Sequence, residues 1–110
     1  MSFSIKKNKI TLTRGDTLKT TIAIKDKDGT PYIPSEGDTI LFAVKKSIED
    51  IEPIFSVDIP WDTLLLHIKP EHTKEMDYGT YVYDCSITMA NGDVHTFITY
   101  TDFILTGEVG

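Results

Sequence analysis

The stretch that decides the fold of this chain is Asp77-Tyr78-Gly79-Thr80-Tyr81-Val82-Tyr83-Asp84-Cys85. An acidic residue, a glycine and then a tyrosine two positions later, at the start of a long strand, form the local pattern of a tyrosine corner. In that motif the tyrosine hydroxyl donates a hydrogen bond to upstream backbone and fixes the crossing between two sheets. The sequence therefore predicts a structural tyrosine corner at Asp77, Gly79 and Tyr81, with the hydroxyl bonded to backbone near 70–77.

A second apolar run follows Asn91-Gly92, the strongest hairpin signal in the chain. Both central residues of a tight primed turn need positive φ, which asparagine and glycine tolerate. The sequence therefore predicts a hairpin that joins a strand over 81–89 to a strand over 94–105.

Five upstream segments alternate apolar and polar residues, as half-buried strands do. These segments are 5–13, 18–25, 39–45, 54–59 and 63–69. Pro70, with acidic Glu71 after it, predicts one short helical turn near 70–76 that carries the chain to the corner.

The spacing of these segments points to a sandwich, because seven or eight strands with turns every eight to twelve residues are typical of that architecture. Together with the corner, it predicts an all-β, immunoglobulin-like two-sheet antiparallel sandwich, formed by a single domain over 1–110. The expected core residues are Ile22, Ile24, Phe42, Val44, Leu64, Leu66 and Tyr81.

The composition excludes several functions. The 110 residues are 40% hydrophobic and 25% charged, with a net charge of −6 that a phosphate backbone would repel, so we expect no nucleic-acid partner. The lone Cys85 cannot staple the fold and is expected to be a buried thiol. No apolar run approaches the ~20 residues of a membrane helix, so we expect a soluble chain made in the cytoplasm, with no membrane partner.

Two turn motifs also have functional interpretations. Arg14-Gly15-Asp16 matches the integrin-ligand tripeptide, but turn chemistry between the first strands already explains it. Asp26-Lys27-Asp28-Gly29 resembles the start of a calcium loop, although Pro31 stands where the sixth position requires glycine. We interpret both as turns.

No other pattern predicts catalysis, a metal or a cofactor. The histidines are not at zinc-ligand spacing, and they are His67, His72 and His95. The sequence therefore predicts no enzyme, no catalytic residue, no metal site and no cofactor.

Four aromatic residues could build a platform for sugar or peptide. They are Tyr32, Trp61, Tyr83 and Tyr100. We instead expect Trp61 to plug one end of the core while the tyrosines cover the core and keep their hydroxyls in water.

A strand edge is the expected contact surface, because open edges pair with other chains unless they are charged or covered. The first strand carries Lys6, Lys7 and Lys9, which protect it. Segment 54–59 has Asp58 as its one charge. The predicted partner-binding edge is therefore Ile54, Phe55, Val57 and Ile59.

The order of these motifs resembles small immunoglobulin-like proteins of bacteriophages and prophages, in particular the N-terminal domains of upper baseplate and tail-fibre-associated proteins. The resemblance rests on Thr13-Arg14-Gly15-Asp16-Thr17, Asp28-Gly29-Thr30-Pro31, Gly37-Asp38-Thr39-Ile40, Gly79-Thr80-Tyr81-Val82-Tyr83-Asp84 and Asn91-Gly92-Asp93-Val94. Thr101-Asp102 stands where such domains often carry a glycine before the last aromatic residue.

The resemblance implies a non-enzymatic virion module that is made in the bacterial cytoplasm and incorporated in the tail or baseplate. Its partners would be other tail proteins or further copies of itself. The alternative is a bacterial cell-surface adhesion or carbohydrate-binding domain with the same kind of sandwich. The motifs describe structure only, so the resemblance transfers no catalytic residue.

Overall fold

The computed structural model describes residues 3–6, 9–25 and 30–107, which form an almost entirely β structure. Strands account for 53% of these residues and helix for 4%, so the all-β prediction is confirmed. The elements in chain order are β1 (Phe3–Lys6), β2 (Lys9–Thr13), β3 (Leu18–Thr21), β4 (Thr39–Lys45), β5 (Phe55–Ile59), β6 (Leu65–Ile68), α1 (Pro70–Thr73), β7 (Gly79–Thr88) and β8 (Val94–Thr106).

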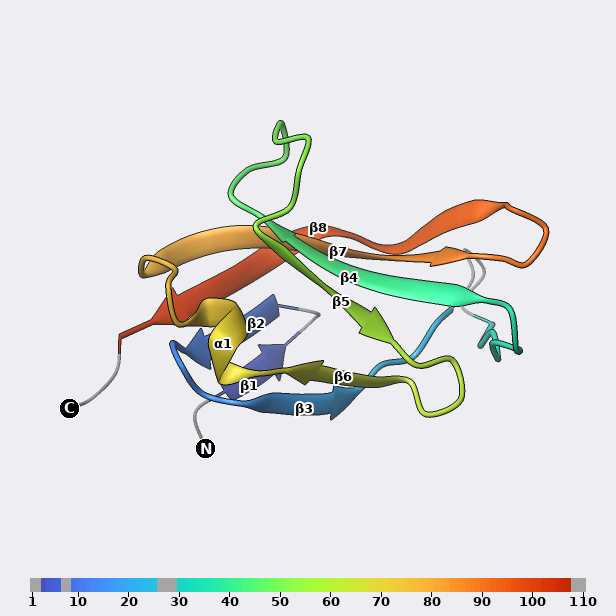
Figure 1. Ribbon diagram of the computed structural model, residues 1–110, viewed down its shortest axis with the longest axis horizontal. Coiled ribbons are helices and arrows are strands. Elements are labelled where there is room, and N and C mark those ends of the chain that lie inside the picture. Colours follow the sequence, from blue (N-terminus) through green and yellow to red (C-terminus); the bar gives the residue numbers. More distant parts are fainter. Residues whose placement is uncertain (1–2, 7–8, 26–29, 108–110) are drawn as a thin grey trace.

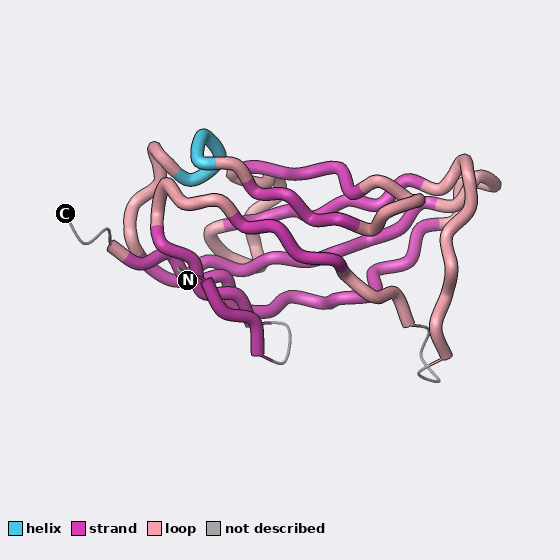
Figure 2. The backbone as a smooth tube through the Cα atoms, turned by 90° about the horizontal axis from the view of Figure 1, so that it is seen from below, coloured by secondary structure: helices cyan, strands magenta, loops and turns pink. Residues whose placement is uncertain are grey.

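Two sheets of unequal size share one core. The larger has six strands in the order β1-β2-β8-β7-β4-β5, and β3 pairs with β6 in the smaller one (Figure 1). The helical turn α1, drawn in cyan, lies toward one end of the molecule (Figure 2). It falls within the predicted 70–76.

The larger sheet is mixed, so the prediction of a purely antiparallel sandwich is wrong. β2 runs parallel to β8, with Ile10 opposite Phe103 and Thr13 opposite Thr106. The other paired strands are antiparallel. No hairpin joins β2 to β8, because β2 continues directly into the other sheet, and so chain connectivity does not impose an antiparallel pair.

The first predicted strand is in fact two strands. β1 pairs back on β2, with Phe3 opposite Leu12 and Ile5 opposite Ile10, whereas the sequence predicted one strand over 5–13. Ile10 and Leu12 are buried. In a straight strand every second residue before Ile10 would face the same core, and residues 8, 6 and 4 are Asn, Lys and Ser. One straight strand over these positions would therefore direct polar residues at an apolar core, which is unfavourable, and β1 instead pairs antiparallel with β2.

The core draws on both sheets and contains most of the predicted residues. Ile24, Phe42, Val44, Leu66 and Tyr81 are buried, while two others, Ile22 and Leu64, are partly buried against the core. The predicted buried thiol is also found, since Cys85 is 1% exposed. The remaining buried apolar residues of this cluster are Ile10, Leu12, Leu18, Ile40, Ile59, Ile68, Met76, Tyr83, Ile87, Phe103 and Leu105.

Two strands are shorter than their alternation suggests. β3 ends at Thr21 because its partner β6 begins only at Leu65. Leu64 has a φ of 54°, which breaks the extended backbone just before β6. The turn predicted at Asp26-Lys27-Asp28-Gly29 lies outside the described residues.

The predicted hairpin between β7 and β8 is present with a different turn. The amide of Gly92 donates to the carbonyl of Met89 at 2.8 Å, and the amide of Met89 donates to the carbonyl of Asp93 at 2.7 Å. Gly92 has a φ of 96°, whereas Asn91 is not among the residues with positive φ. The loop is therefore a type I turn followed by a left-handed glycine, a common alternative to the two-residue primed turn.

The end of the molecule near this hairpin is fixed by Asp38. Its Oδ2 accepts hydrogen bonds from the Ser35 amide at 3.0 Å and from the Tyr32 hydroxyl at 2.8 Å. These bonds lower the pKa of Asp38, the Ser35 amide contributing most. Neighbouring Gly37 has a φ of 100°, and a Cβ there would lie 3.2 Å from that of Ala90.

Candidate functional site

The tyrosine corner has the expected geometry. The hydroxyl of Tyr81 donates to the carbonyl of Asp77 at 2.7 Å, and the Tyr81 side chain is 7% exposed. Gly79, at the start of β7, has a φ of 146°, which favours glycine. Burial, and then the charge of Asp77, raise the pKa of Tyr81. The corner is a structural device that orients β7.

The Arg14-Gly15-Asp16 turn packs against this corner and is not displayed as a free loop. The Arg14 guanidinium donates to the Met76 carbonyl at 3.2 Å and lies 4.2 Å from the centre of the Tyr78 ring. The Gly15 amide donates to Oγ1 of the buried Thr73 at 3.0 Å. The tripeptide therefore locks β2 and β3 to α1.

The predicted partner-binding edge is an edge, but its apolar side chains turn inward. β5 ends the order of the larger sheet, and Ile59 is 3% exposed. Phe55 and Val57 pack against the core, because they pair with the buried Val44 and Phe42. The apolar side chains of β5 are therefore not an exposed docking face.

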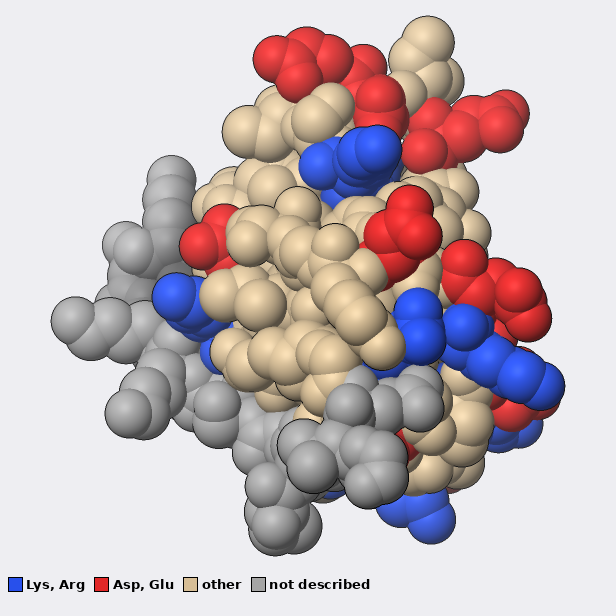
Figure 3. Space-filling model, turned by 90° about the vertical axis from the view of Figure 1, so that its left-hand side faces the viewer, with Lys and Arg blue, Asp and Glu red and all other residues tan. Residues whose placement is uncertain are grey.

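Ile54, a residue of the predicted edge, precedes β5 and is one of three exposed isoleucines in the loop between β4 and β5. Ile48, Ile51 and Ile54 are 57%, 92% and 45% exposed on the loop that projects between β4 and β5 (Figure 1). Acidic side chains gather at the top of the molecule, where this loop stands (Figure 3). The signal was available in the spacing of three isoleucines in a polar segment.

The three histidines do not gather at one site, and His72 has structural contacts. Nδ1 of His72 accepts from the Lys69 amide at 2.9 Å, and the His72 ring stacks on Phe55 with centroids 5.2 Å apart. His67 lies in the neighbouring groove between β5 and β6. Within residues 9–25 and 30–107, no three His, Cys, Asp or Glu side chains are placed to hold a metal ion.

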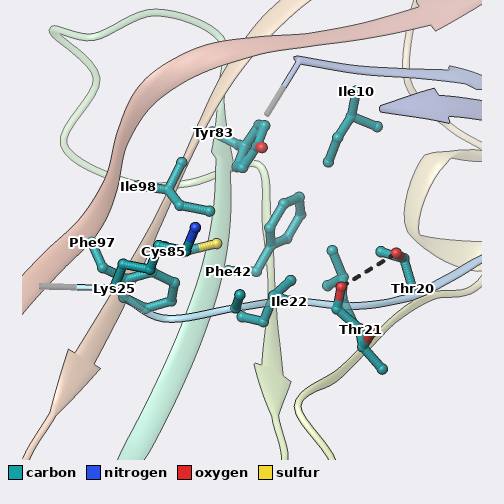
Figure 4. Close-up of a pocket in the computed structure, with 12 residues that line it drawn as sticks. Ile10, Thr20, Thr21, Ile22, Lys25, Phe42, Tyr83, Cys85, Phe97 and Ile98 are labelled. Carbon is teal, nitrogen blue, oxygen red and sulfur yellow. Dashed lines mark hydrogen bonds between the residues drawn. The ribbon is translucent and has the colours of Figure 1, made fainter. Parts of the chain in front are cut away.

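Another opening lies between β8 and the end of β3 with the segment that follows it. We call it the side groove. Its lining comes from the end of β3 and the segment after it, from β8 and from the core (Figure 4). The first of these contributes Thr20, Thr21, Ile22, Ala23 and Lys25, β8 contributes Phe97 and Ile98, and the core contributes Ile10, Phe42, Leu66, Tyr83 and Cys85. It encloses about 390 Å³, more than ten times the ~30 Å³ that one water molecule occupies. The space is large enough for side chains.

The groove continues toward the β7–β8 hairpin. A second cavity of about 450 Å³ shares Lys25 and Phe97 with the first. Its other lining residues are Ile24, Tyr32, Ile87, Met89, His95 and Thr96. The two cavities together form a mostly apolar channel beside β8.

Irregular pairing of β8 shapes its part of the lining. The register between β7 and β8 shifts on both sides of Cys85, which is paired with Ile98. Adjacent residues of a regular strand point to opposite faces, whereas an extra residue at a bulge re-aims its neighbours. Phe97 and Ile98 can therefore both line the groove.

Unpaired strand edges border the groove on both sides. On its outer side β8 pairs with β2 only from Phe103 to Thr106, and no backbone hydrogen bond reaches residues 94–102 there within the described chain. Just after β3, the Ile22 amide donates to the Leu64 carbonyl on the side of β6. Backbone groups of successive strand residues point in alternate directions, so those of the preceding residue, Thr21, point away from β6. The Thr21 carbonyl accepts a hydrogen bond from the neighbouring Thr20 hydroxyl at 3.4 Å.

The ionisable groups of the groove are poorly suited to reaction chemistry. Burial raises the pKa of the Cys85 thiol to about 12, so the nucleophilic thiolate is scarce near neutral pH. Burial likewise raises the pKa of Tyr83. The lining of the side groove is mostly apolar.

The aromatic residues do not form one platform. Tyr83 is 3% exposed inside the core, while Trp61 and Tyr100 are 39% and 40% exposed. Trp61 therefore does not fill one end of the core, contrary to the prediction. Tyr32 lines the second cavity, next to the side groove.

No protein-family model, no curated protein and no solved structure matches this chain. No helix among the described residues is long and apolar enough to span a membrane.

Proposed function

We propose that this chain is a non-enzymatic docking module, a small β-sandwich that binds other proteins during the assembly of a phage or prophage tail. The observation that carries the proposal is the side groove, an apolar channel bordered by two unpaired strand edges. Such edges are templates for pairing with another chain, and proteins that do not use them cover or charge them.

The proposal includes an immunoglobulin-type sandwich. The order β8-β7-β4-β5 corresponds to strands G, F, C and C′ of that fold, and β3-β6 to strands B and E. The tyrosine corner supports this assignment, since it stands at the start of β7, after the connection from β6, where the fold places it at the E–F corner. Among the described residues, the smaller sheet consists of β3 and β6 alone.

The exposed isoleucines of the β4–β5 loop also support docking. Ile48, Ile51 and Ile54 are exposed on one loop, and exposed apolar surface is a common feature of contact sites. Ile51, at 92% exposure, is held out from the fold with no contribution to the core. The assignment to a tail rests on the sequence resemblance.

The experiment that tests the function is fractionation of an induced lysogen that carries the gene. We expect an antibody against the chain to find it in intact, purified particles. Its presence in the cell-wall fraction and absence from particles would favour the adhesion or carbohydrate-binding alternative. A hydrolytic activity lost on changing a single carboxylate would replace both.

A further inference from the structure

We infer that the side groove accepts an extended segment of another protein, which pairs with the outer edge of β8 along residues 94–102 and places alternate apolar side chains in the groove. This inference rests on the proposed docking function and names the chemistry of the partner. The segment would lie in line with β2 and pair with the residues of β8 that precede Phe103.

The partner segment would pair with the part of the β8 edge that β2 does not cover. β2 follows β8 only from Ile10 opposite Phe103 onward, and upstream of Lys9 the chain turns back as β1. Among residues 3–6, 9–25 and 30–107, nothing pairs with the rest of the outer β8 edge, which continues the line along which β2 pairs. A strand added there would continue the pairing that β2 already makes with residues 103–106 of β8.

The groove selects for alternating apolar residues. A strand paired with β8 turns every second side chain toward the inner face of the sheet, next to Ile10. That space is lined by Phe42, Ile98 and Phe97. Main-chain hydrogen bonds would supply affinity, and the pockets for alternate side chains would supply specificity.

The chain itself is a poor occupant. Continued straight along β8, its own N-terminal segment would turn Asn, Lys and Ser at 8, 6 and 4 toward this apolar space. A second copy brings the same segment and a net charge of −6, which opposes self-association. A segment of a different protein fits both constraints.

The register shifts restrict which segment fits. Bulges interrupt the regular ladder and make an edge harder to pair indiscriminately. The shifts on either side of Ile98 lie in the middle of the open edge. These register shifts therefore favour a partner segment whose backbone hydrogen-bonding groups fit the irregular spacing of the β8 edge.

The test selects displayed random nine-residue peptides on the full chain and measures the binding of enriched peptides by fluorescence anisotropy. We expect enriched peptides to carry apolar residues at every second position. Ala23→Arg should weaken them by roughly tenfold or more, because Ala23 is exposed and lines the groove, so that an arginine there obstructs the channel without removing a core contact. Thr80→Arg, at an exposed position of β7 outside the groove, is the matched control and should leave binding unchanged.

Failure to enrich any peptide, or enriched peptides that bind Ala23→Arg as tightly as the unaltered chain, would overturn the inference. Dimerisation of the chain that Ala23→Arg abolishes would assign the groove to a second copy instead. The particle fractionation separates the two proposals. If Ala23→Arg enters particles as efficiently as the unaltered chain, docking stands and the groove is not its site, whereas absence of the unaltered chain from particles removes the assembly function itself.

Discussion

Tyr81→Phe is the substitution that tests the tyrosine corner most cleanly. It removes one hydroxyl and leaves the ring, which packs with the core at 7% exposure. The hydroxyl makes a 2.7 Å hydrogen bond to the Asp77 carbonyl and thereby ties the start of β7 to the chain segment before it. The change therefore isolates a single bond.

The expected loss is about 1 kcal/mol of unfolding free energy. A net intramolecular hydrogen bond contributes roughly 0.5–1.5 kcal/mol, and leaving a buried partner unsatisfied adds to that. Asp77 is exposed, so water can reach its carbonyl once the hydroxyl is gone, and the additional penalty is small. The loss should therefore stay near the middle of this range.

Urea unfolding followed by circular dichroism measures the loss. With an m-value typical of a small domain, the midpoint should fall by roughly 0.5–1 M while m stays unchanged. Tyr100→Phe is the control, because Tyr100 is exposed and its hydroxyl lies 3.5 Å from Lys45 Nζ at the surface. Equal midpoints for Tyr81→Phe and the unaltered chain would refute the structural role of the corner.

Three further outcomes follow from other contacts. Thr73→Val should cost about 1–3 kcal/mol in the same urea assay, because the Gly15 amide loses its acceptor inside the fold, and an unchanged midpoint would contradict this. Gly37→Ala should cost about 1 kcal/mol or more, since φ is 100° and the new Cβ would lie 3.2 Å from that of Ala90; a stabilised variant would show the strain to be absent. Burial raises the pKa of the Cys85 thiol from 9.0 to about 12, so its contribution to stability is complete below pH 9.0 and declines as the pH rises from 9.0 toward 12. Cys85→Ala should flatten that decline in urea titrations, and an identical alkaline slope would count against it.

Local signals predicted the elements of this fold well. Tyr81 was placed correctly because the corner depends on residues within one short stretch. The helical turn at Pro70 likewise follows from local capping preferences. Alternation identified the strands but could not show where a pairing partner ends. It therefore did not predict that β3 stops at Thr21, where its pairing with β6 ends.

The site was harder to predict, because exposure depends on neighbours that are distant in sequence. Phe55 and Val57 have the alternation of an edge strand, but only the register with β4 shows that they face inward. The side groove depends on the reversal of the chain before Lys9 and on the register shifts beside Ile98. A partial signal for the reversal existed, since the inward-facing apolar alternation of β2 does not extend upstream of Ile10.

Hydrogen exchange along β8 tests the central claim most directly. In the free protein, amides on the open outer edge of residues 94–102 should exchange rapidly, whereas those of 103–106, paired with β2, should be protected. In the complex with a selected peptide, protection should extend along 94–102 while the β4–β5 loop stays unchanged. Protection confined to that loop or to β5, with 94–102 exchanging as in the free protein, would contradict a strand-accepting groove beside β8.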